Sequence, residues 1–207
     1  MSFFSRFKTL MKQEPEEQIA GYSICDLKTI FTASSPETTA PLFEYPKVMS
    51  LRQLGISAFY ISFLIDSKDT LNFLTLINLT FRYQSEKTFN DLPAKHYVND
   101  KKNEHLVFFT STREFNGTTV RMVTNSTDFM DEIFRAKFAP PPPWVAFEGY
   151  KPSWWGGDMQ GAQGYYDDNY FRPFFTRLSD SEKQTYYTRF EATDEWIKNL
   201  ELMYSND

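Results

Sequence analysis

The clearest alternation of apolar and polar residues lies in the middle third of the chain. Residues 77–83 read Ile-Asn-Leu-Thr-Phe-Arg-Tyr, a strict period of two. Successive side chains of a strand point to opposite faces, so this segment predicts a half-buried strand. We expect its inner face to carry Ile77, Leu79, Phe81 and Tyr83.

A β-hairpin is predicted around Asn116-Gly117. This dipeptide tolerates the positive φ angles that a two-residue hairpin turn requires, and the segments 105–114 and 118–124 on either side have strand character. The preceding segment, 84–104, is polar and predicts a loop. Together these patterns predict an antiparallel sheet in the middle of the chain, with one face on the core.

Helices are predicted at both ends of the chain. Near the N-terminus, Ser2 caps an amphipathic pattern with apolar residues at helical spacing, namely Phe3, Phe4, Phe7, Leu10 and Met11. Such a helix packs on its own domain or contacts a membrane surface or a partner, and the sequence leaves these alternatives open.

Three more helices are expected after the sheet. The first is capped by Ser126 or Thr127 and runs through Phe134. The second begins near Ser181, because Ser179 and Glu182 form a capping box. The last is capped by Thr193 and has four apolar residues on one side: Trp196, Ile197, Leu200 and Met203.

The secondary structure of two segments remains ambiguous, and a third segment marks a candidate boundary between subdomains. The apolar run Leu51–Ile65 fits a buried helix or a buried strand, and strand pairing within Gly21–Ala33 cannot be assigned. The run Pro140–Pro143 forbids helix and predicts a stiff connector. We therefore expect one α+β domain over residues 1–207, with a candidate subdomain boundary at this proline run.

Composition and charge narrow the class of protein. Hydrophobic residues make up 41% of the 207 residues, enough to form one sizeable core. The 22 basic residues are scattered among 27 acidic ones, and the formal charge of -5 disfavours nucleic acid binding. The most apolar stretch, 56–79, is interrupted by charged residues, which argues against a transmembrane segment. Without a secretory signal pattern, we expect a cytoplasmic protein.

Several catalytic and metal chemistries lack sequence support. The only histidines are His96 and His105, and no nucleophile-elbow motif accompanies them. Cys25 is the single cysteine, so no internal disulfide forms and no usual zinc-ligand spacing exists. Neither a P-loop nor a dinucleotide-binding fingerprint is present. We predict no catalytic residue, no metal site and no cofactor.

Segment 150–170 combines aromatic residues, glycines and carboxylates. Its carboxylates and rings fit a sugar site, or a calcium site whose spacing departs from the helix-loop-helix pattern. They also fit a protein-binding surface, since Trp and Tyr are frequent binding hot spots, or simple packing of the loop onto the core. The candidate partner-binding residues are Trp154, Trp155, Asp158, Tyr165, Tyr166, Asp167, Asp168 and Tyr170.

A resemblance to a protein family lies in the last third of the chain. In order, this third carries the proline run, Trp144-Val145-Ala146-Phe147, Gly161-Ala162-Gln163-Gly164-Tyr165-Tyr166, Phe171-Arg172-Pro173-Phe174-Phe175, Leu178-Ser179 and Trp196. In this order of features it resembles small acidic bacterial immunity proteins, which neutralise a toxin delivered by a neighbouring cell. The resemblance implies a cytoplasmic protein that blocks its toxin by direct, tight contact.

These observations predict a non-catalytic binding protein, in first place an immunity protein whose partner is a protein, for example a basic toxin domain attracted by acidic residues. One alternative is a carbohydrate-active or other hydrolytic enzyme that uses Asp158 with Glu148, Asp167 or Asp168. A further alternative is a structural or adaptor protein that uses its N-terminal helix. The sequence does not define the oligomeric state.

Overall fold

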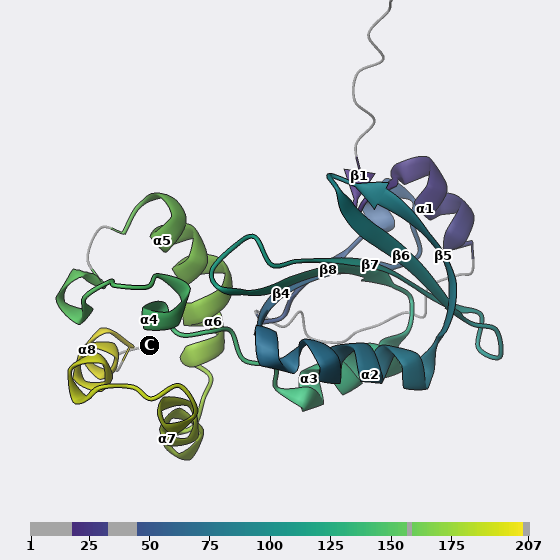
Figure 1. The fold of residues 1–207 in the computed structure, drawn as a ribbon. Coiled ribbons are helices and arrows are strands. Elements are labelled where there is room, and N and C mark those ends of the chain that lie inside the picture. The colour runs from purple at the N-terminus through teal and green to yellow at the C-terminus, as the bar shows by residue number, and fades with distance from the viewer. Residues whose placement is uncertain (1–17, 33–44, 157–158, 205–207) are drawn as a thin grey trace, which may run out of the picture.

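A six-stranded antiparallel sheet forms the centre of the molecule (Figure 1). The computed structural model describes residues 18–32, 45–156 and 159–204. Across the sheet the strands are β3 (Lys47–Ser50), β4 (Phe59–Asp66), β8 (Gly117–Thr124), β7 (Glu104–Ser111), β6 (Leu92–Asn99) and β5 (Arg82–Phe89). The predicted α+β class, with an antiparallel sheet from the middle of the chain, is confirmed. The predicted N-terminal helix lies outside the described residues.

The two faces of the sheet are covered differently. Helices α2 (Thr70–Thr80) and α3 (Thr127–Ala136) lie along the inner face, where apolar side chains of the strands and helices form one hydrophobic cluster. On the outer face, a smaller cluster packs beneath α1 (Ile24–Ile30) and the short strands β1 (Gln18–Ile19) and β2 (Tyr22–Ser23). Within the described chain, α1 covers only one part of the outer face.

The remaining helices gather beyond the edge of the sheet where β4 ends and β8 begins (Figure 1). They are α4 (Pro143–Ala146), α5 (Gly161–Tyr166), α6 (Arg172–Phe175), α7 (Asp180–Arg189) and α8 (Asp194–Tyr204), with a π-helical turn at Asp167–Phe171. Their buried aromatic residues continue the inner-face cluster without interruption. No described helix is both long and apolar enough to cross a bilayer.

The proline run connects the sheet region to these helices and is buried along its whole length. Proline has no N–H, so only the carbonyl groups need partners inside the protein. The Pro140 carbonyl accepts the Tyr186 hydroxyl at 2.8 Å, and the Pro141 carbonyl accepts the Tyr166 hydroxyl. The Pro142 and Pro143 carbonyls accept backbone N–H groups of α4 and the residue after it. Every carbonyl of the run is satisfied.

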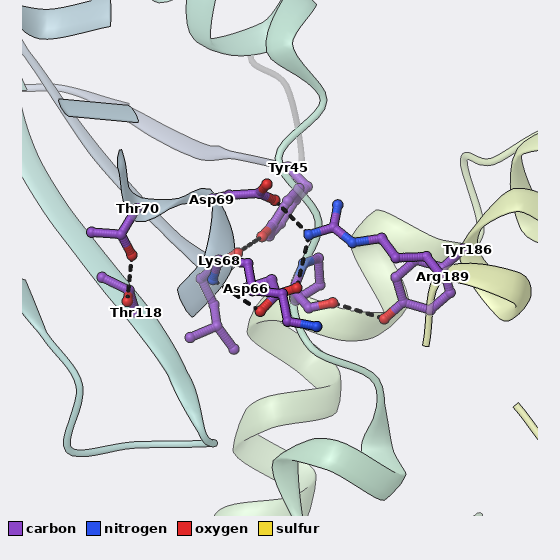
Figure 2. A network of polar contacts seen from close by, with 10 residues as sticks. Tyr45, Asp66, Lys68, Asp69, Thr70, Thr118, Tyr186 and Arg189 are labelled. Atoms are coloured by element: carbon purple, nitrogen blue, oxygen red, sulfur yellow. Dashed lines mark hydrogen bonds and ion pairs between the residues drawn. The ribbon is translucent and has the colours of Figure 1, made fainter. Parts of the chain in front are cut away.

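An ion-pair network joins the end of β4 to α7 (Figure 2). The Arg189 guanidinium lies 2.8 Å from a carboxylate oxygen of Asp66 and 2.9 Å from one of Asp69. Those two side chains are only 12% and 16% exposed. Partly buried carboxylates require such a partner, so Arg189 helps to fix the C-terminal helices against the sheet.

The strand predicted at 77–83 is wrong, because Ile77 and Leu79 belong to helix α2. Phe73 and Ile77 are buried at helical spacing, whereas Leu79 is 79% exposed. The helix carries apolar residues around most of its circumference, so its period of 3.6 is hidden in the sequence. Strand β5 begins only after Phe81.

The loop predicted at 84–104 is also wrong, because β5 and β6 occupy most of this segment. β5 is an edge strand with mostly exposed residues, which explains its polar composition. The turn between the two strands consists of Asn90 and Asp91, both with positive φ, at 49° and 61°. This is the backbone conformation of a two-residue hairpin turn.

The hairpin of β7 and β8 is confirmed, but its predicted turn is not. The connection spans residues 112–116, and Gly117 is the first residue of β8, outside the positive-φ region. Phe115 and Asn116 take the positive φ angles instead, at 58° and 47°. Phe115 uses this conformation to reach the aromatic rings of the C-terminal helices.

Three predicted helices are confirmed, and the structure assigns the two ambiguous segments. Helices α3, α7 and α8 are confirmed, with Ser126 as the cap of α3 and a capping box formed by Ser179 and Glu182 at α7. Of the ambiguous run Leu51–Ile65, residues from Phe59 onward form a strand. Residues 24–30 of the unassigned segment Gly21–Ala33 form helix α1.

Replacing Arg189 with Gln should lower the free energy of unfolding by about 2 kcal/mol, because two partly buried carboxylates lose their charged partner. Arg82→Gln is the matched control. Its ion pair with Asp100 joins side chains that are 61% and 72% exposed, and we expect a loss below about 1 kcal/mol. Urea unfolding of both variants measures the difference, and equal losses would contradict the structural role given to Arg189.

Replacing Gly117 with Ala should destabilise the protein by about 1 to 3 kcal/mol through overpacking rather than through φ. An added Cβ would lie 2.9 Å from the Ile65 carbonyl oxygen and 3.0 Å from a Pro141 side-chain carbon. The denaturation midpoint of the variant tests this. An unchanged midpoint would show that the strand and the proline run are not packed this closely.

Candidate functional site

The structure divides the predicted aromatic recognition residues between core and surface. Trp155, Tyr166 and Tyr170 are 3%, 0% and 2% exposed, whereas Trp154 and Tyr165 are 54% and 48% exposed. The buried rings pack the C-terminal helices together. In this conformation only Trp154 and Tyr165 among them are open to a partner.

The predicted acidic residues do not form a charged rim within the described chain. Asp167 is buried and accepts a hydrogen bond from the Tyr204 hydroxyl at 2.6 Å. Burial raises the pKa of Asp167, and this hydrogen bond opposes the rise. Asp168 is exposed and pairs with Arg172. Asp158 lies outside the described residues.

A groove made of two adjacent hollows lies on the outer face of the sheet. Its first part is a hollow of about 130 Å³ where the sheet meets the π-helical turn. The sheet and the turn line this hollow with Lys47, Met49, Tyr60, Ser62, Arg121, Tyr165, Asn169 and Tyr170. Tyr165 is thus the predicted recognition residue that is both exposed and part of a cavity wall.

A second hollow, of about 160 Å³, continues the same face toward the turn between β5 and β6. Its apolar lining comes from Phe89, Leu92 and Phe109, and its charged lining from Arg113, Glu114 and Arg121. Arg121 borders both hollows. We call the two hollows together the outer-face groove.

The register of the sheet explains why these residues meet. Arg121 on β8 pairs with Ser62 on β4 and with Phe109 on β7, and Ser62 pairs with Lys47 on β3. Paired residues share a face, so these four side chains form one row across the outer face. The Arg121 guanidinium lies 5.9 Å from the centre of the Phe109 ring, a cation–π contact.

A helix irregularity places the tyrosines at the groove. Pro173 has no N–H for the carbonyl four residues before it, and the helix widens into the π turn over Asp167–Phe171. Tyr165 and Tyr170 thereby face the same hollow, with ring centres 5.9 Å apart in an edge-on arrangement. Phe115 contacts both rings from the loop between β7 and β8.

The charge of the groove differs from that of the whole chain. Its described lining contains three cationic residues, Lys47, Arg113 and Arg121, and one carboxylate, Glu114. The chain as a whole carries a formal charge of -5. The groove is therefore a local cationic site on an acidic protein.

A larger hollow, of about 290 Å³, lies between α3 and α6 and is mainly apolar. The charged residues at its edge already have partners in the protein. Lys137 pairs with Glu182, and Arg177 donates to the Tyr45 carbonyl at 2.8 Å. These groups join neighbouring segments of the protein to one another, and they do not converge on a ligand.

The residues considered for catalysis do not assemble an active site among the described parts of the chain. His96 Nε2 lies 3.1 Å from His105 Nδ1, so each histidine faces the other. Cys25 is exposed on α1. None of the three hollows is lined by Glu148, Asp167 or Asp168. No described group of three or more His, Cys, Asp or Glu residues is placed to hold a metal ion.

No family model, curated protein or solved structure matches the chain. The function of the groove must therefore be inferred from its own residues. Sequence reasoning missed Lys47, Met49, Tyr60 and Arg121, because strand order brings them together. One signal was present: Arg121 is the single charged residue of β8, a central strand otherwise made of Gly, Thr, Val and Met.

The histidine pair predicts a pH dependence of stability. Burial and the charge of His105 lower the pKa of His96 from 6.5 to about 4. Between pH 6.5 and 4 the unfolded chain therefore binds a proton that the folded state excludes, so stability falls as the pH falls through this window. We expect His96→Gln to reduce this fall by about 1 to 2 kcal/mol, allowing for the partly exposed ring.

Urea unfolding of parent and variant across the same pH range measures this difference. Carboxylates that titrate in this window contribute equally to both proteins, so the difference reports on the histidine pair. Identical pH profiles would contradict the neutral, buried state assigned to the pair. Replacing both histidines with Gln should leave partner binding unchanged, because neither lines the groove.

Proposed function

We propose that this protein is a non-catalytic binding protein that acts by direct contact with a protein partner, through the outer-face groove. The observation that carries the proposal is Arg121. Its side chain is half-buried between two hollows lined with aromatic residues, and no described acidic side chain forms an ion pair with it. Arg and Tyr are, with Trp, the residue types most often found as energetic anchors of protein interfaces.

The size of the hollows supports a protein partner. Pockets for small-molecule ligands usually measure about 300 to 1,000 Å³. At about 130 and 160 Å³, the two parts of the groove each fit a single amino-acid side chain. A surface with two adjacent hollows of this size suits two side chains of one protein segment.

The enzyme alternative has weaker support. A glycoside hydrolase needs two carboxyl groups that face one another across a substrate-binding cavity. The described candidates are divided instead, because Asp167 is hydrogen-bonded in the core and Asp168 is paired with Arg172 on the surface. Among the described residues, Glu114 is the only carboxylate that lines the groove.

An immunity protein is the specific function that we propose within this class, because its mode of action needs no catalytic group. It requires a preorganised surface that covers a toxin by tight contact. The groove meets that requirement, since its strands belong to the sheet and Tyr165 is held by packing against Phe115. The resemblance in the last third of the chain adds to this proposal.

Affinity capture with the tagged full chain tests the proposal. Tyr165→Ala combined with Met49→Ala removes two exposed apolar side chains of the groove, at 48% and 45% exposure. The matched control is Leu202→Ala on α8, where Leu202 is 75% exposed and remote from the groove lining. We expect a partner that the parent and the control capture equally and that the groove variant retains at least about tenfold less, as for loss of an anchor.

The captured partner is then purified and assayed with and without the protein. An immunity role predicts that equimolar parent abolishes a toxic activity of the partner, while the groove variant at the same concentration does not. Equal capture by all three proteins, with folding checked by circular dichroism, would contradict the groove as the binding surface. A partner without toxic activity would contradict the immunity role alone.

A further inference from the structure

Arg121 differs from the arginines whose partners are carboxylates. Arg82, Arg172 and Arg189 each form an ion pair with an aspartate, whereas Arg121 forms none with a described residue. It emerges from the centre of the sheet, where β4 and β7 flank its strand. Its guanidinium lies 5.9 Å from the centre of the Phe109 ring.

Such a position is costly for a cation. A partly buried guanidinium loses water, and the face of an aromatic ring returns only about 0.5 to 2 kcal/mol. A carboxylate returns more, because the planar guanidinium binds it through two parallel hydrogen bonds. The free protein therefore presents a donor that lacks its best acceptor.

Lys47 adds a second cation to the same row. Ser62 lies between Lys47 and Arg121 on adjacent strands, which places their backbones about 10 Å apart. A carboxylate above Ser62 would be within reach of both long side chains. Next to this position, Phe89, Leu92 and Phe109 provide an apolar hollow of about 160 Å³.

The floor of that hollow contains a further unsatisfied polar group. Thr119 is 1% exposed, and its hydroxyl has no hydrogen-bond partner within the described structure. It pairs with Ser111 on β7 and belongs to the hollow lining. The Thr119 hydroxyl is one of three such atoms in the described structure, with Glu104 Oε2 and the Tyr187 hydroxyl, so by itself it does not indicate a ligand.

We propose that the outer-face groove binds an acidic segment of a protein partner, in which one Asp or Glu carboxylate pairs with Arg121 and Lys47. An apolar side chain of the same segment occupies the neighbouring hollow lined by Phe89, Leu92 and Phe109. This inference rests on the proposed binding function and adds the chemistry of the partner. It reverses the expectation of a basic partner, because the groove itself is cationic.

The same charges favour a protein segment over nucleic acid. Binding to a phosphate backbone uses many cations spread along the strand, and proteins that do so are usually basic. The residues described around the groove include three cations and one carboxylate, on a chain with a formal charge of -5. Attraction in the groove acts over short range, within a Debye length of about 8 to 10 Å, and it suits one or two carboxylates.

Selection from a phage-displayed library of random linear peptides on the immobilised full chain tests the proposal. We expect enriched peptides to carry Asp or Glu at a fixed distance from an aromatic or aliphatic residue. Changing that acidic residue to its amide should weaken binding of the synthetic peptide about tenfold or more, the loss of one charge-assisted hydrogen bond. Arg121→Gln should cause a similar loss.

Arg135→Gln is the matched control, because it makes the same charge change on α3, at the inner face. It should leave peptide affinity unchanged. The melting temperature of Arg121→Gln is a second readout. An arginine kept for a partner, without an internal ion pair, predicts a melting temperature equal to or above that of the parent. A strong decrease would assign Arg121 a structural role and overturn the proposal.

The remaining outcomes separate this proposal from the broader one. Enriched peptides that lose affinity with Tyr165→Ala but not with Arg121→Gln would keep the groove and overturn its acidic partner. Peptides without acidic residues, or no enrichment at all, would also overturn the proposal. A single-stranded oligonucleotide probe that binds the parent but not Arg121→Gln would replace the protein segment with nucleic acid.

Discussion

Four consecutive prolines pass through the interior between the sheet and the C-terminal helices, and the arrangement of those helices depends on how the proline carbonyls are satisfied. Because proline offers no N–H, the run can be buried once each carbonyl has a donor. The Tyr186 and Tyr166 hydroxyls and the backbone of α4 supply these donors. The donors lie on α4, directly after α4, on α5 and on α7, so satisfying the prolines fixes these three helices beside the sheet. The ion pairs of Arg189 with Asp66 and Asp69 join the same two regions, and we call this boundary between the sheet and the C-terminal helices the seam.

The groove is a consequence of this seam. Strands β3, β4 and β8 form the sheet part of the groove. The wall with Tyr165 and Tyr170 is present only because α5 and the π turn are held beside the start of β8. Phe115 makes the connection rigid, with a positive φ that costs backbone energy and is compensated by its aromatic contacts. A rigid surface loses little entropy on binding, which suits an inhibitor that acts by contact alone.

Local signals were readable in the sequence and non-local ones were not. The capping residues Ser126 and Ser179 lie within three residues of the groups they bind, so α3 and α7 could be predicted. Helix α2 was missed because apolar residues surround it, and β5 because an edge strand exposed to water has a polar composition. The aromatic residues of segment 150–170 predict a binding surface, yet Trp155 and Tyr166 are buried because they pack against α8 and the proline run. Arg121 lies beside the other groove residues because of the strand order, and the strand order cannot be read from the composition of the chain.

A partner that binds through the outer-face groove contacts the sheet and the π turn at once. Hydrogen–deuterium exchange of the full chain, free and saturated with its tightest binding peptide or captured partner, measures this directly. We predict slower exchange on binding in two separate stretches, 117–124 of β8 and 165–171 of α5 and the π turn, with β3 also affected and α2 and α3 unchanged. Protection confined to α2 and α3, or to the C-terminal helices without β8, would contradict it.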